Sequence, residues 1–295
     1  MNLSNIKVLV TGSNGLLGQS ICQYLFKKKI SIIPTGRGSV RNTQFNSIYL
    51  DLDVTSKHTW DKILDSYKPG VIINTAAMTN VDECEKNHKL SLSTNSLSMS
   101  NYLEYMKKNK THFIQISTDF VFDGKKGLYV EDDPCSPLNF YGFTKLEAEK
   151  YIIENHSNYT ILRTSLLYGN NVLDNNLFMW VKQKMQNNQA LNIVNDQYRT
   201  PTYVNDLASV VLQCLEEKKY GIYHISSGER LSIFDIVCNI AESFRFNASL
   251  INRIKSKELK QVAQRPMDSS LDITKAIEQL NFKPTLLRAA LKKII

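Results

Sequence analysis

Short apolar runs alternate with longer amphipathic stretches through the first 170 residues of the chain. Runs of about five β-branched and other apolar residues predict buried strands, and apolar residues that recur every three or four positions predict helices. Strands are expected at 7–11, 30–35, 48–52, 71–76, 112–117 and 160–168, and helices at 16–28, 56–67, 88–108 and 143–155. Strands separated by helices pair in parallel through right-handed crossovers. The predicted fold class is therefore α/β, a doubly wound parallel sheet with helices on both faces.

The pattern loosens beyond residue 170. Helices are expected at 175–187, 205–217, 231–244 and 273–280, followed by a short tail helix, and one late strand is expected at 221–227. We predict a dinucleotide-binding domain of residues 1–170 with a return segment at about 196–226. A smaller, mixed α/β substrate domain would comprise about 171–195 and 227–295. It is expected to cover the carboxyl edge of the sheet, where ligands of open parallel sheets bind.

The first expected strand runs into a glycine-rich turn that opens the first helix, with the sequence Gly12, Ser13, Asn14, Gly15, Leu16, Leu17 and Gly18. Gly12 permits the tight turn, Gly15 lets the backbone approach a pyrophosphate, and Gly18 allows close packing of helix and sheet. The helix N-terminus adds free N–H groups and a positive dipole. This turn at the first strand-to-helix junction predicts a dinucleotide site.

The end of the second expected strand carries Arg37, and no carboxylate lies between residues 35 and 41. An acid there would hold the ribose 2′-OH of NAD, whereas a guanidinium can bind the 2′-phosphate of NADP. We therefore predict a preference for NADP, with NAD as the alternative. Leu52 and Asp53 end the third strand beside the expected cofactor, where Asp53 either receives the adenine amino group or caps the next helix.

Tyr141 and Lys145 lie four residues apart at the expected start of a helix, which puts both side chains on one face. An ammonium near a phenol favours the phenolate and lowers the pKa of the tyrosine from about 10. Such a tyrosine can pass a proton to a carbonyl oxygen while hydride arrives at the carbon. In the stretch Ser117, Thr118 and Asp119 at the end of the fifth strand, the Thr118 hydroxyl can reach the same cleft. Taken alone, Thr118 could equally be a turn residue.

Composition narrows the function further. The 295 residues carry a formal net charge of +8, which a Lys-rich surface largely explains, and no nucleic-acid motif accompanies it. Five scattered cysteines without a CxxC pair and five histidines without metal spacing predict neither disulfides nor a metal site. No apolar run approaches the roughly 20 residues of a membrane span, and no signal peptide is evident. We expect a cytoplasmic protein that binds neither nucleic acid nor membrane.

Several blocks along the chain together resemble a known family. They are TGSNGLLG at 11–18, NTAAMTNVDECE at 74–85, STDFVFDG at 117–124, YGFTK at 141–145, RTSLLYG at 163–169, DQYRTPT at 196–202 and RPMDSSLD at 265–272. In this order they resemble the extended short-chain dehydrogenase/reductases, which have a Rossmann fold, and within them the dTDP-4-dehydrorhamnose reductase family. The resemblance implies an NADPH- or NADH-dependent reduction of a nucleotide-linked 4-keto-6-deoxy sugar.

The resemblance also implies roles for single residues. Tyr141 would donate the proton, Lys145 would bind the nicotinamide ribose, and Thr118 would contact the keto group. The backbone from Gly12 to Leu17 would wrap the pyrophosphate. The remaining positions along the cofactor would be Ala76, Ala77, Thr79, Asn95, Ser117, Tyr141 and Lys145. Asn95 either supports the site or is a solvated helix residue.

Two positions depart from the family pattern. A tryptophan is replaced by Leu166, which leaves room for a differently shaped sugar, and a glycine is replaced by Arg199. Arg199 could pair with a phosphate, although a neighbouring carboxylate is slightly favoured. Arg265 could reach a diphosphate or cap the packing of the smaller domain. The candidate substrate-binding residues are thus Thr118, Asp119, Leu166, Arg199 and Arg265, and the expected partner is a nucleotide sugar, with a homodimer as a further option.

Three other functions compete with the predicted reductase activity. Dehydratases of the superfamily carry a glutamate base after Thr-Asp, where this chain has Phe120. Epimerases retain NAD and would prefer an acid at Arg37. A regulatory subunit that resembles the beta subunit of methionine adenosyltransferase would bind NADP without catalysis, and its pattern tolerates an arginine in the block at 196–202.

Overall fold

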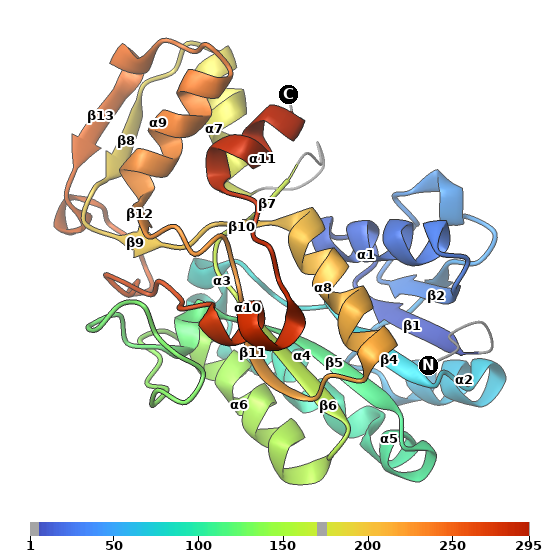
Figure 1. Ribbon diagram of the computed structural model, residues 1–295. Coiled ribbons are helices and arrows are strands. Elements are labelled where there is room, and N and C mark those ends of the chain that lie inside the picture. Colours follow the sequence, from blue (N-terminus) through green and yellow to red (C-terminus); the bar gives the residue numbers. More distant parts are fainter. Residues whose placement is uncertain (1–5, 170–175, 295) are drawn as a thin grey trace.

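The computed structural model describes residues 6–169 and 176–294 (Figure 1). The central sheet contains β1 (Lys7–Thr11), β2 (Ser31–Gly36), β3 (Leu50–Asp51), β4 (Val71–Asn74), β5 (His112–Thr118), β6 (Tyr159–Thr164) and β11 (Gly221–Ile225). These seven strands lie in the order β11-β6-β5-β4-β1-β2-β3, and every neighbouring pair is parallel. The predicted fold class, a doubly wound α/β sheet, is confirmed. The strand order reverses between β1 and β4, so their carboxyl ends border the crevice where ligands of such sheets bind.

Alternate residues of each strand feed two separate cores. Val8 and Val10 of β1 face α1 (Leu16–Lys27) and α8 (Val204–Glu217), whereas Leu9 faces the opposite side. There it meets α2 (Lys57–Tyr67), α5 (Leu103–Asn109) and α6 (Phe140–Asn155). Both faces of the sheet are therefore covered by helices, as parallel sheets require.

One predicted helix is wrong in extent. The stretch 88–108 forms α4 (His88–Asn95), a 3₁₀ segment at Leu97–Asn101 and α5, and an unpredicted helix, α3 (Val81–Lys86), precedes it. Hydroxyls in this serine-rich run bond to nearby backbone carbonyls, such as Ser98 Oγ to Thr94 O at 2.9 Å. These local bonds compete with a continuous helix.

Two other predicted elements are divided. The strand expected at 160–168 breaks after β6 because Leu166 has a left-handed backbone with φ +41°, and β7 (Leu167–Tyr168) follows. The helix expected at 231–244 begins as β12 (Leu231–Ser232) before α9 (Ile233–Ser243). The Ser232 hydroxyl caps α9 by accepting from the Asp235 amide at 3.0 Å.

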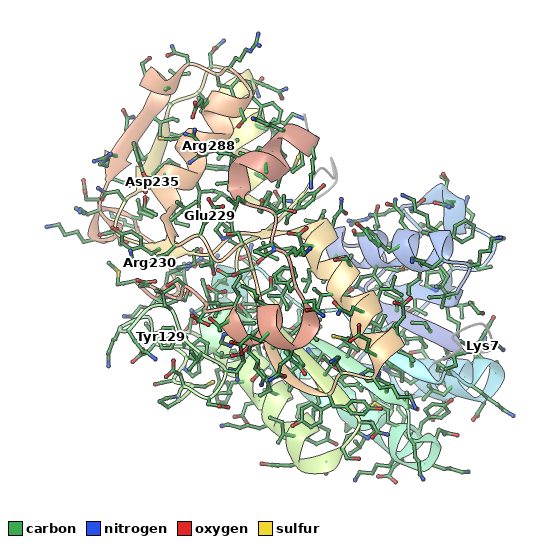
Figure 2. All side chains as sticks on the ribbon, in the orientation of Figure 1. Lys7, Tyr129, Glu229, Arg230, Asp235 and Arg288 are labelled. Carbon is green, nitrogen blue, oxygen red and sulfur yellow. The ribbon has the colours of Figure 1, made fainter. Side chains whose placement is uncertain are left out.

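A second group of elements lies above the carboxyl edge of the sheet (Figure 1). It contains α7 (Leu177–Gln186), α9, α11 (Leu287–Ile294) and the parallel pair β8 (Leu191–Val194) and β13 (Ile251–Ile254), a pair that the sequence did not predict. Short strands β9 (Tyr198–Arg199) and β10 (Thr202–Tyr203) lead back to the sheet. Figure 2 labels Glu229 and Arg230 where this group meets the sheet.

The predicted domain limits stay a prediction. α10 (Thr274–Leu280), which belongs to the expected substrate domain, packs against β11 and α8 of the main sheet. The expected boundary at 170–171 and the first five residues, where no signal peptide is expected, lie outside the described residues. Among the described residues, no helix is long and apolar enough to cross a membrane.

Candidate active site

The glycine-rich turn has the geometry of a phosphate cradle. Gly12 has φ +64°, and a Cβ on it would lie 2.8 Å from the Ala76 amide nitrogen. A Cβ on Gly18 would collide with the Gly12 carbonyl, whereas one on Gly15 would make only ordinary contact. Gly15 begins α1 and no side chain caps its N-terminus. The turn thus needs its first and third glycines for packing, and its second leaves the helix N-terminus open to an anion.

The loop after β2 is tied to this turn. The Asn14 side chain donates to the Ser39 carbonyl at 2.9 Å and accepts from the Arg41 amide at 2.9 Å, while Arg37 is exposed. The sequence-based expectation missed a carboxylate here, because Asp51 of β3 accepts from the Gly38 amide at 2.9 Å. Strand pairing, which the sequence does not show, brings this acid to the loop.

Leu52 and Asp53 have local roles in the structure. Asp53 accepts from the Thr55 amide at 2.9 Å and the Thr55 hydroxyl at 2.7 Å. These hydrogen bonds, aided by Arg37, hold the pKa of Asp53 below its usual value. Asp53 therefore shapes the turn before α2, but the cap of that helix is Ser56, so the expected capping role is wrong and the adenine contact stays a prediction. The Leu52 side chain is 1% exposed and lies in the core.

A chain of buried polar groups crosses the carboxyl edge of the sheet. The Thr11 hydroxyl donates to Asn74 Oδ1 at 2.6 Å, and Asn74 Nδ2 donates to Gln115 Oε1 at 2.9 Å. The Ile116 carbonyl accepts from Gln115 Nε2 at 2.9 Å and from Lys145 Nζ at 2.6 Å. The ammonium of Lys145 is thereby held at the Ile116 carbonyl of β5.

Tyr141 and Thr118 lie together at this edge and Lys145 is bonded to the Ile116 carbonyl of β5, but the electrostatics of Tyr141 and Lys145 differ from the expectation. Thr118 hydrogen-bonds the Tyr141 phenol, yet burial raises the pKa of Tyr141 and the Asp119 carboxylate raises it further. Burial also lowers the pKa of Lys145 to about 8. The expected lowering of the Tyr141 pKa by Lys145 is therefore wrong for the protein alone. Desolvation outweighs the hydrogen bond, and the ammonium is directed to a backbone carbonyl.

Asn95 is buried and bridges two elements of the site. Its side chain accepts from the Met78 amide at 2.7 Å and donates to the Thr144 hydroxyl at 3.0 Å. Thr144 in turn donates to the Tyr141 carbonyl at 2.9 Å. Of the two expected roles, solvated or supporting, the contacts favour the supporting one. The loop after β4 that Asn95 holds carries the predicted cofactor positions Ala76, Ala77 and Thr79, all partly or fully exposed.

Asp119 and Arg199 form an ion pair sealed from solvent. Arg199 Nε lies 3.7 Å from Asp119 Oδ2, and both side chains are 4% exposed. Asp119 also accepts from the Ser165 hydroxyl at 3.0 Å and from the Ser269 hydroxyl. Arg199 therefore pairs with a carboxylate, the alternative that the sequence slightly favoured. Asp119 and Arg199 are buried and bind each other, so neither side chain is free to make the direct substrate contact that the sequence led us to expect.

Ser117 faces a second buried ion pair rather than open solvent. Its hydroxyl donates to Glu149, which binds Arg163 NH2 at 2.7 Å. The sequence offered only weak signals for this pair: a carboxylate one turn after Lys145 and a lone arginine in an apolar strand. Glu149 also opposes the lowering of the Lys145 pKa by burial.

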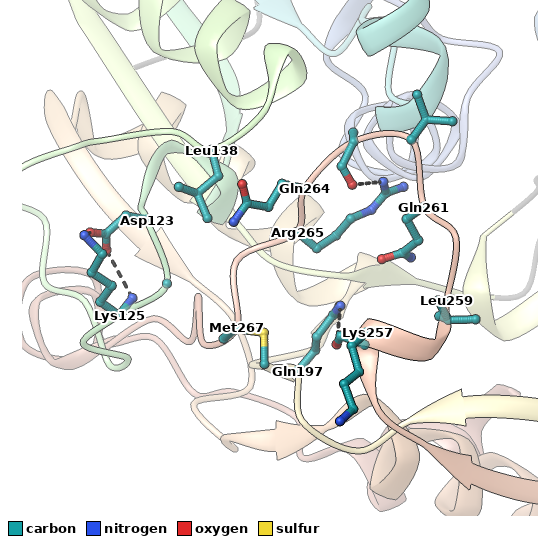
Figure 3. Close-up of a pocket in the computed structure, with 14 residues that line it drawn as sticks. Asp123, Lys125, Leu138, Gln197, Lys257, Leu259, Gln261, Gln264, Arg265 and Met267 are labelled. Atoms are coloured by element: carbon teal, nitrogen blue, oxygen red, sulfur yellow. Dashed lines mark hydrogen bonds and ion pairs between the residues drawn. The ribbon is translucent and has the colours of Figure 1, made fainter.

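A cavity of about 750 Å³ opens beside the start of α6 (Figure 3). Its lining includes the basic side chains Lys125, Lys257 and Arg265 and the amides Gln197, Gln261 and Gln264. Leu138 forms the wall nearest α6, and Asn139 Nδ2 donates to the Gln264 carbonyl at 2.8 Å. Tyr141, Lys145 and Thr118 do not line this cavity themselves.

Arg265 and Leu166 lie in different places. Arg265 lines the cavity and donates to Asp82 of α3 and to the Ala263 carbonyl at 2.6 Å. Asp82 lies in the sequence block at 74–85, but its ion pair with Arg265 was not predicted. Leu166 packs against the apolar core beside Phe178, away from the cavity, so the structure does not bring it to Arg265. Among the described residues, no cluster of side chains could hold a metal ion.

The fold is that of the short-chain dehydrogenase/reductases. The model of the RmlD substrate binding domain family matches residues 6–295, and the chain belongs to this family. It is 34% identical over 300 residues to the dTDP-4-dehydrorhamnose reductase of Aggregatibacter actinomycetemcomitans, with 98% of each chain covered. The crystal structure of dTDP-4-dehydrorhamnose reductase from Bacillus anthracis in complex with NADP is similar, with a TM-score of 0.87, 26% identity and 98% of each chain covered.

A relative with a different role is nearly as similar. Methionine adenosyltransferase 2 subunit beta of Rattus norvegicus is 31% identical over 282 residues, which cover 93% of this chain and 83% of that protein. The relatives of this chain therefore include proteins named as reductases and a protein named as a subunit.

Proposed function

We propose that the protein is a reductase that uses NADPH to reduce the 4-keto group of a nucleotide-linked 6-deoxy sugar. The observation that carries this proposal is that Thr118 and Tyr141 lie together at the carboxyl edge of the sheet, with Lys145 bonded to the adjoining Ile116 carbonyl. The similarity to dTDP-4-dehydrorhamnose reductases over the whole chain supports the same substrate class.

The residues present suit NADP, because the Asp51 carboxylate at the loop after β2 is occupied by the Gly38 amide. Gly15 leaves space at the open N-terminus of α1, where a pyrophosphate would be held by the backbone of residues 12–17. The exposed Arg37 would face the 2′-phosphate, and Ala76, Ala77 and Thr79 would run along the rest of the cofactor. When bound, NADPH supplies hydride to the keto carbon.

Residues of the chain would bind and protonate the oxygen of that keto group. The Thr118 hydroxyl, which donates to Asp119 in the protein alone, would turn to donate to that oxygen, and Tyr141 would give it a proton as the alkoxide develops. Burial keeps the pKa of Tyr141 high, so the phenol is protonated at neutral pH, as a proton donor must be. Lys145 would hold the nicotinamide ribose while it remains anchored to Ile116.

The residues that line the cavity suit the nucleoside diphosphate part of the proposed substrate. Lys257 and Arg265 provide positive charge for a diphosphate, with Arg265 held in place by Asp82, whereas Lys125 is paired with Asp123 of the same lining. Three glutamine amides offer both donors and acceptors, which suit a nucleobase edge or sugar hydroxyls.

The test is steady-state oxidation of NADPH with a panel of 4-keto-6-deoxy sugar nucleotides. Tyr141→Phe should lower kcat on the order of 10²–10⁴-fold and leave the Kd for NADP nearly unchanged, because it removes only the transferable proton. Tyr151→Phe, on the same helix but remote from the site, is the matched control and should behave like the wild type. Full turnover in Tyr141→Phe would refute the assignment.

A regulatory subunit is the second candidate, favoured by the similarity to methionine adenosyltransferase 2 subunit beta. NADP binding without turnover across the whole panel would support it. Copurification or titration with a methionine adenosyltransferase catalytic subunit would then be the direct measurement.

A further inference from the structure

Arg199 lies in β9, and its side chain is buried. Its guanidinium has contacts both with residues that line the cavity and with residues near Tyr141. It donates to the Tyr198 carbonyl at 2.7 Å, pairs with Asp119 and lies over the Phe120 ring at 5.1 Å from its centroid. A buried arginine in an ion pair is weak evidence for stability alone, since an apolar side chain could fill the same space. Its contacts therefore need another explanation.

Two routes lead from Arg199 to the Tyr141 phenol. Asp119, its ion-pair partner, accepts a hydrogen bond from the Thr118 hydroxyl at 3.2 Å, and Thr118 hydrogen-bonds the phenol. Phe120 meets the Tyr141 ring edge to face, with centroids 6.1 Å apart and planes at 72°. One side chain thus braces both the hydroxyl and the ring that border the phenol.

The other side of Arg199 faces the cavity wall. Its NH2 group lies 3.5 Å from Gln197 Oε1, and Gln197 Nε2 donates to the Ser256 hydroxyl at 3.0 Å. Both Gln197 and Ser256 line the cavity. A ligand in the cavity therefore contacts a wall that is connected, through Arg199, to the groups around Tyr141.

The geometry points to Arg199 as a positioning residue that holds Thr118 and Phe120 against Tyr141 and connects them to the substrate cavity. The predicted effect of Arg199 on kcat rests on the proposed reductase function, whereas its effect on the position of the Tyr141 ring does not. Arg199 touches neither of the reacting groups itself and acts through Asp119 and Phe120. Lysine could keep the charge but not the flat guanidinium that lies over the ring.

Arg199→Met should lower kcat about 10–100-fold, because small displacements of reacting groups have effects of this size, while the Kd for NADPH stays unchanged. Arg199→Lys should recover part of the loss. Arg230, which directly precedes β12, is the control for the same kinds of contact in an exposed position: it pairs with Asp268 at 2.6 Å and lies over the Tyr198 ring at 3.9 Å, with its side chain 43% exposed. Arg230→Met should leave kcat unchanged, and an equal loss in both variants would overturn the proposal.

Because Arg199→Met leaves a buried carboxylate unpaired, it is also tested together with Asp119→Asn, which removes the second charge. The amide oxygen of Asn can still accept from Ser165 and Ser269, while the Thr118 hydroxyl loses its carboxylate acceptor. The double variant should fold with the wild-type circular dichroism spectrum and still show the reduced kcat. A folded double variant with wild-type kcat would contradict the positioning role.

A spectroscopic readout separates this inference from the proposed function. With 3-fluorotyrosine incorporated, the ¹⁹F resonance that disappears in Tyr141→Phe reports the surroundings of that ring, whether or not the protein turns over a substrate. Arg199→Met should shift and broaden this resonance, whereas Arg230→Met should not. If no sugar nucleotide is reduced but the resonance shifts, the proposed function fails and the positioning role stands. A resonance unmoved by Arg199→Met overturns the positioning role.

Discussion

At the scale of single residues, burial moves the two ionisable groups of the site in opposite directions. It raises the pKa of the Tyr141 phenol and lowers that of the Lys145 ammonium to about 8, since desolvation always favours the neutral form. Near neutral pH the phenol thus holds its proton and the lysine holds its charge. As the pH rises above neutral, Lys145 loses its proton before Tyr141 does.

The first prediction concerns cofactor binding and pH. The Kd for NADPH should rise as the pH increases through about 8, because Lys145 then loses the charge that faces a polyanion. Fluorescence titrations between about pH 6.5 and 9.5 would measure this. Lys145→Met should bind more weakly at low pH and show a flatter profile. The same slope in both proteins would assign the pH dependence to another group.

His112 gives a second prediction, for stability. Burial lowers its pKa to about 4, and its Nε2 lies 2.8 Å from the Thr160 hydroxyl. Because the folded-state pKa is below the unfolded value, only the unfolded chain takes up this proton between about pH 6.5 and 4, and stability falls as the pH falls through that window.

Urea unfolding at pH 7 and pH 5 would measure the effect. The free energy of unfolding should fall by about 2 kcal/mol from this group, and His112→Gln should lack that part of the decrease. The exposed His58 provides the control, and His58→Gln should keep the wild-type decrease. An identical pH dependence in the two variants would contradict the assignment.

At the scale of elements, the start of α6 fixes the position of Tyr141. Asn139 caps the helix by accepting from the Gly142 amide at 2.9 Å, and the Glu85 carboxylate accepts from the Phe140 amide at 2.9 Å. A Cβ on Gly142 would collide with the Phe120 carbonyl. The helix can approach the Thr118 edge so closely only because this position is glycine.

Asn139→Ala is therefore expected to have two effects. Loss of the cap should lower the free energy of unfolding by about 1 kcal/mol, and loss of the bond to Gln264 should raise the KM for the sugar nucleotide. Ser56, which caps α2 far from the cavity, is the matched control. Ser56→Ala should lose similar stability and keep its KM, and a KM change of equal size in both variants would count against the link between cap and cavity.

The same elements show what the sequence can and cannot predict. The strands at 7–11 and 112–117 and the cap at Ser56 follow from local pattern, because apolar runs and capping side chains act within a few residues. The pair β8 and β13 joins segments about 60 residues apart, and no local pattern encodes such a pairing. The break within 88–108 likewise depends on hydroxyl-to-backbone bonds that compete with the helix.

For the site, the residue types of Thr118, Tyr141 and Lys145 were predictable, but their environment was not. The pKa of Tyr141 depends on how deeply it is buried and on the carboxylate of Asp119, which directly follows β5. The Arg199 ion pair depends on where β9 meets the end of β5. Motifs name the chemical groups, and only the packing of distant segments sets their charge states.

At the scale of the whole molecule, one apolar core continues from the sheet into the second group of elements. It includes Val8 and Val10 of β1, Leu207 of α8, Ile236 of α9 and Leu291 of α11. The C-terminal helix is therefore packed into the same core as the first strand. A core shared in this way favours unfolding in one cooperative step, because neither group keeps its buried surface without the other.

Leu291→Ala tests this cooperativity from one end of the molecule. The residue is fully buried, so its truncation should lower the free energy of unfolding by about 2–5 kcal/mol. Leu286 is half exposed, and Leu286→Ala should change stability by less than about 0.5 kcal/mol. Trp60 lies in the separate core on the opposite face of the sheet, and Trp180→Phe leaves it as the only tryptophan.

In the Trp180→Phe background, the urea midpoint from Trp60 fluorescence should fall with Leu291→Ala as far as the midpoint from far-ultraviolet circular dichroism. The reason is that loss of packing around α11 can reach Trp60 only if both cores unfold together. A fluorescence midpoint that stays in place while the dichroism midpoint falls would mean that the second group of elements unfolds on its own, and the predicted division into two domains would then also be a division in stability.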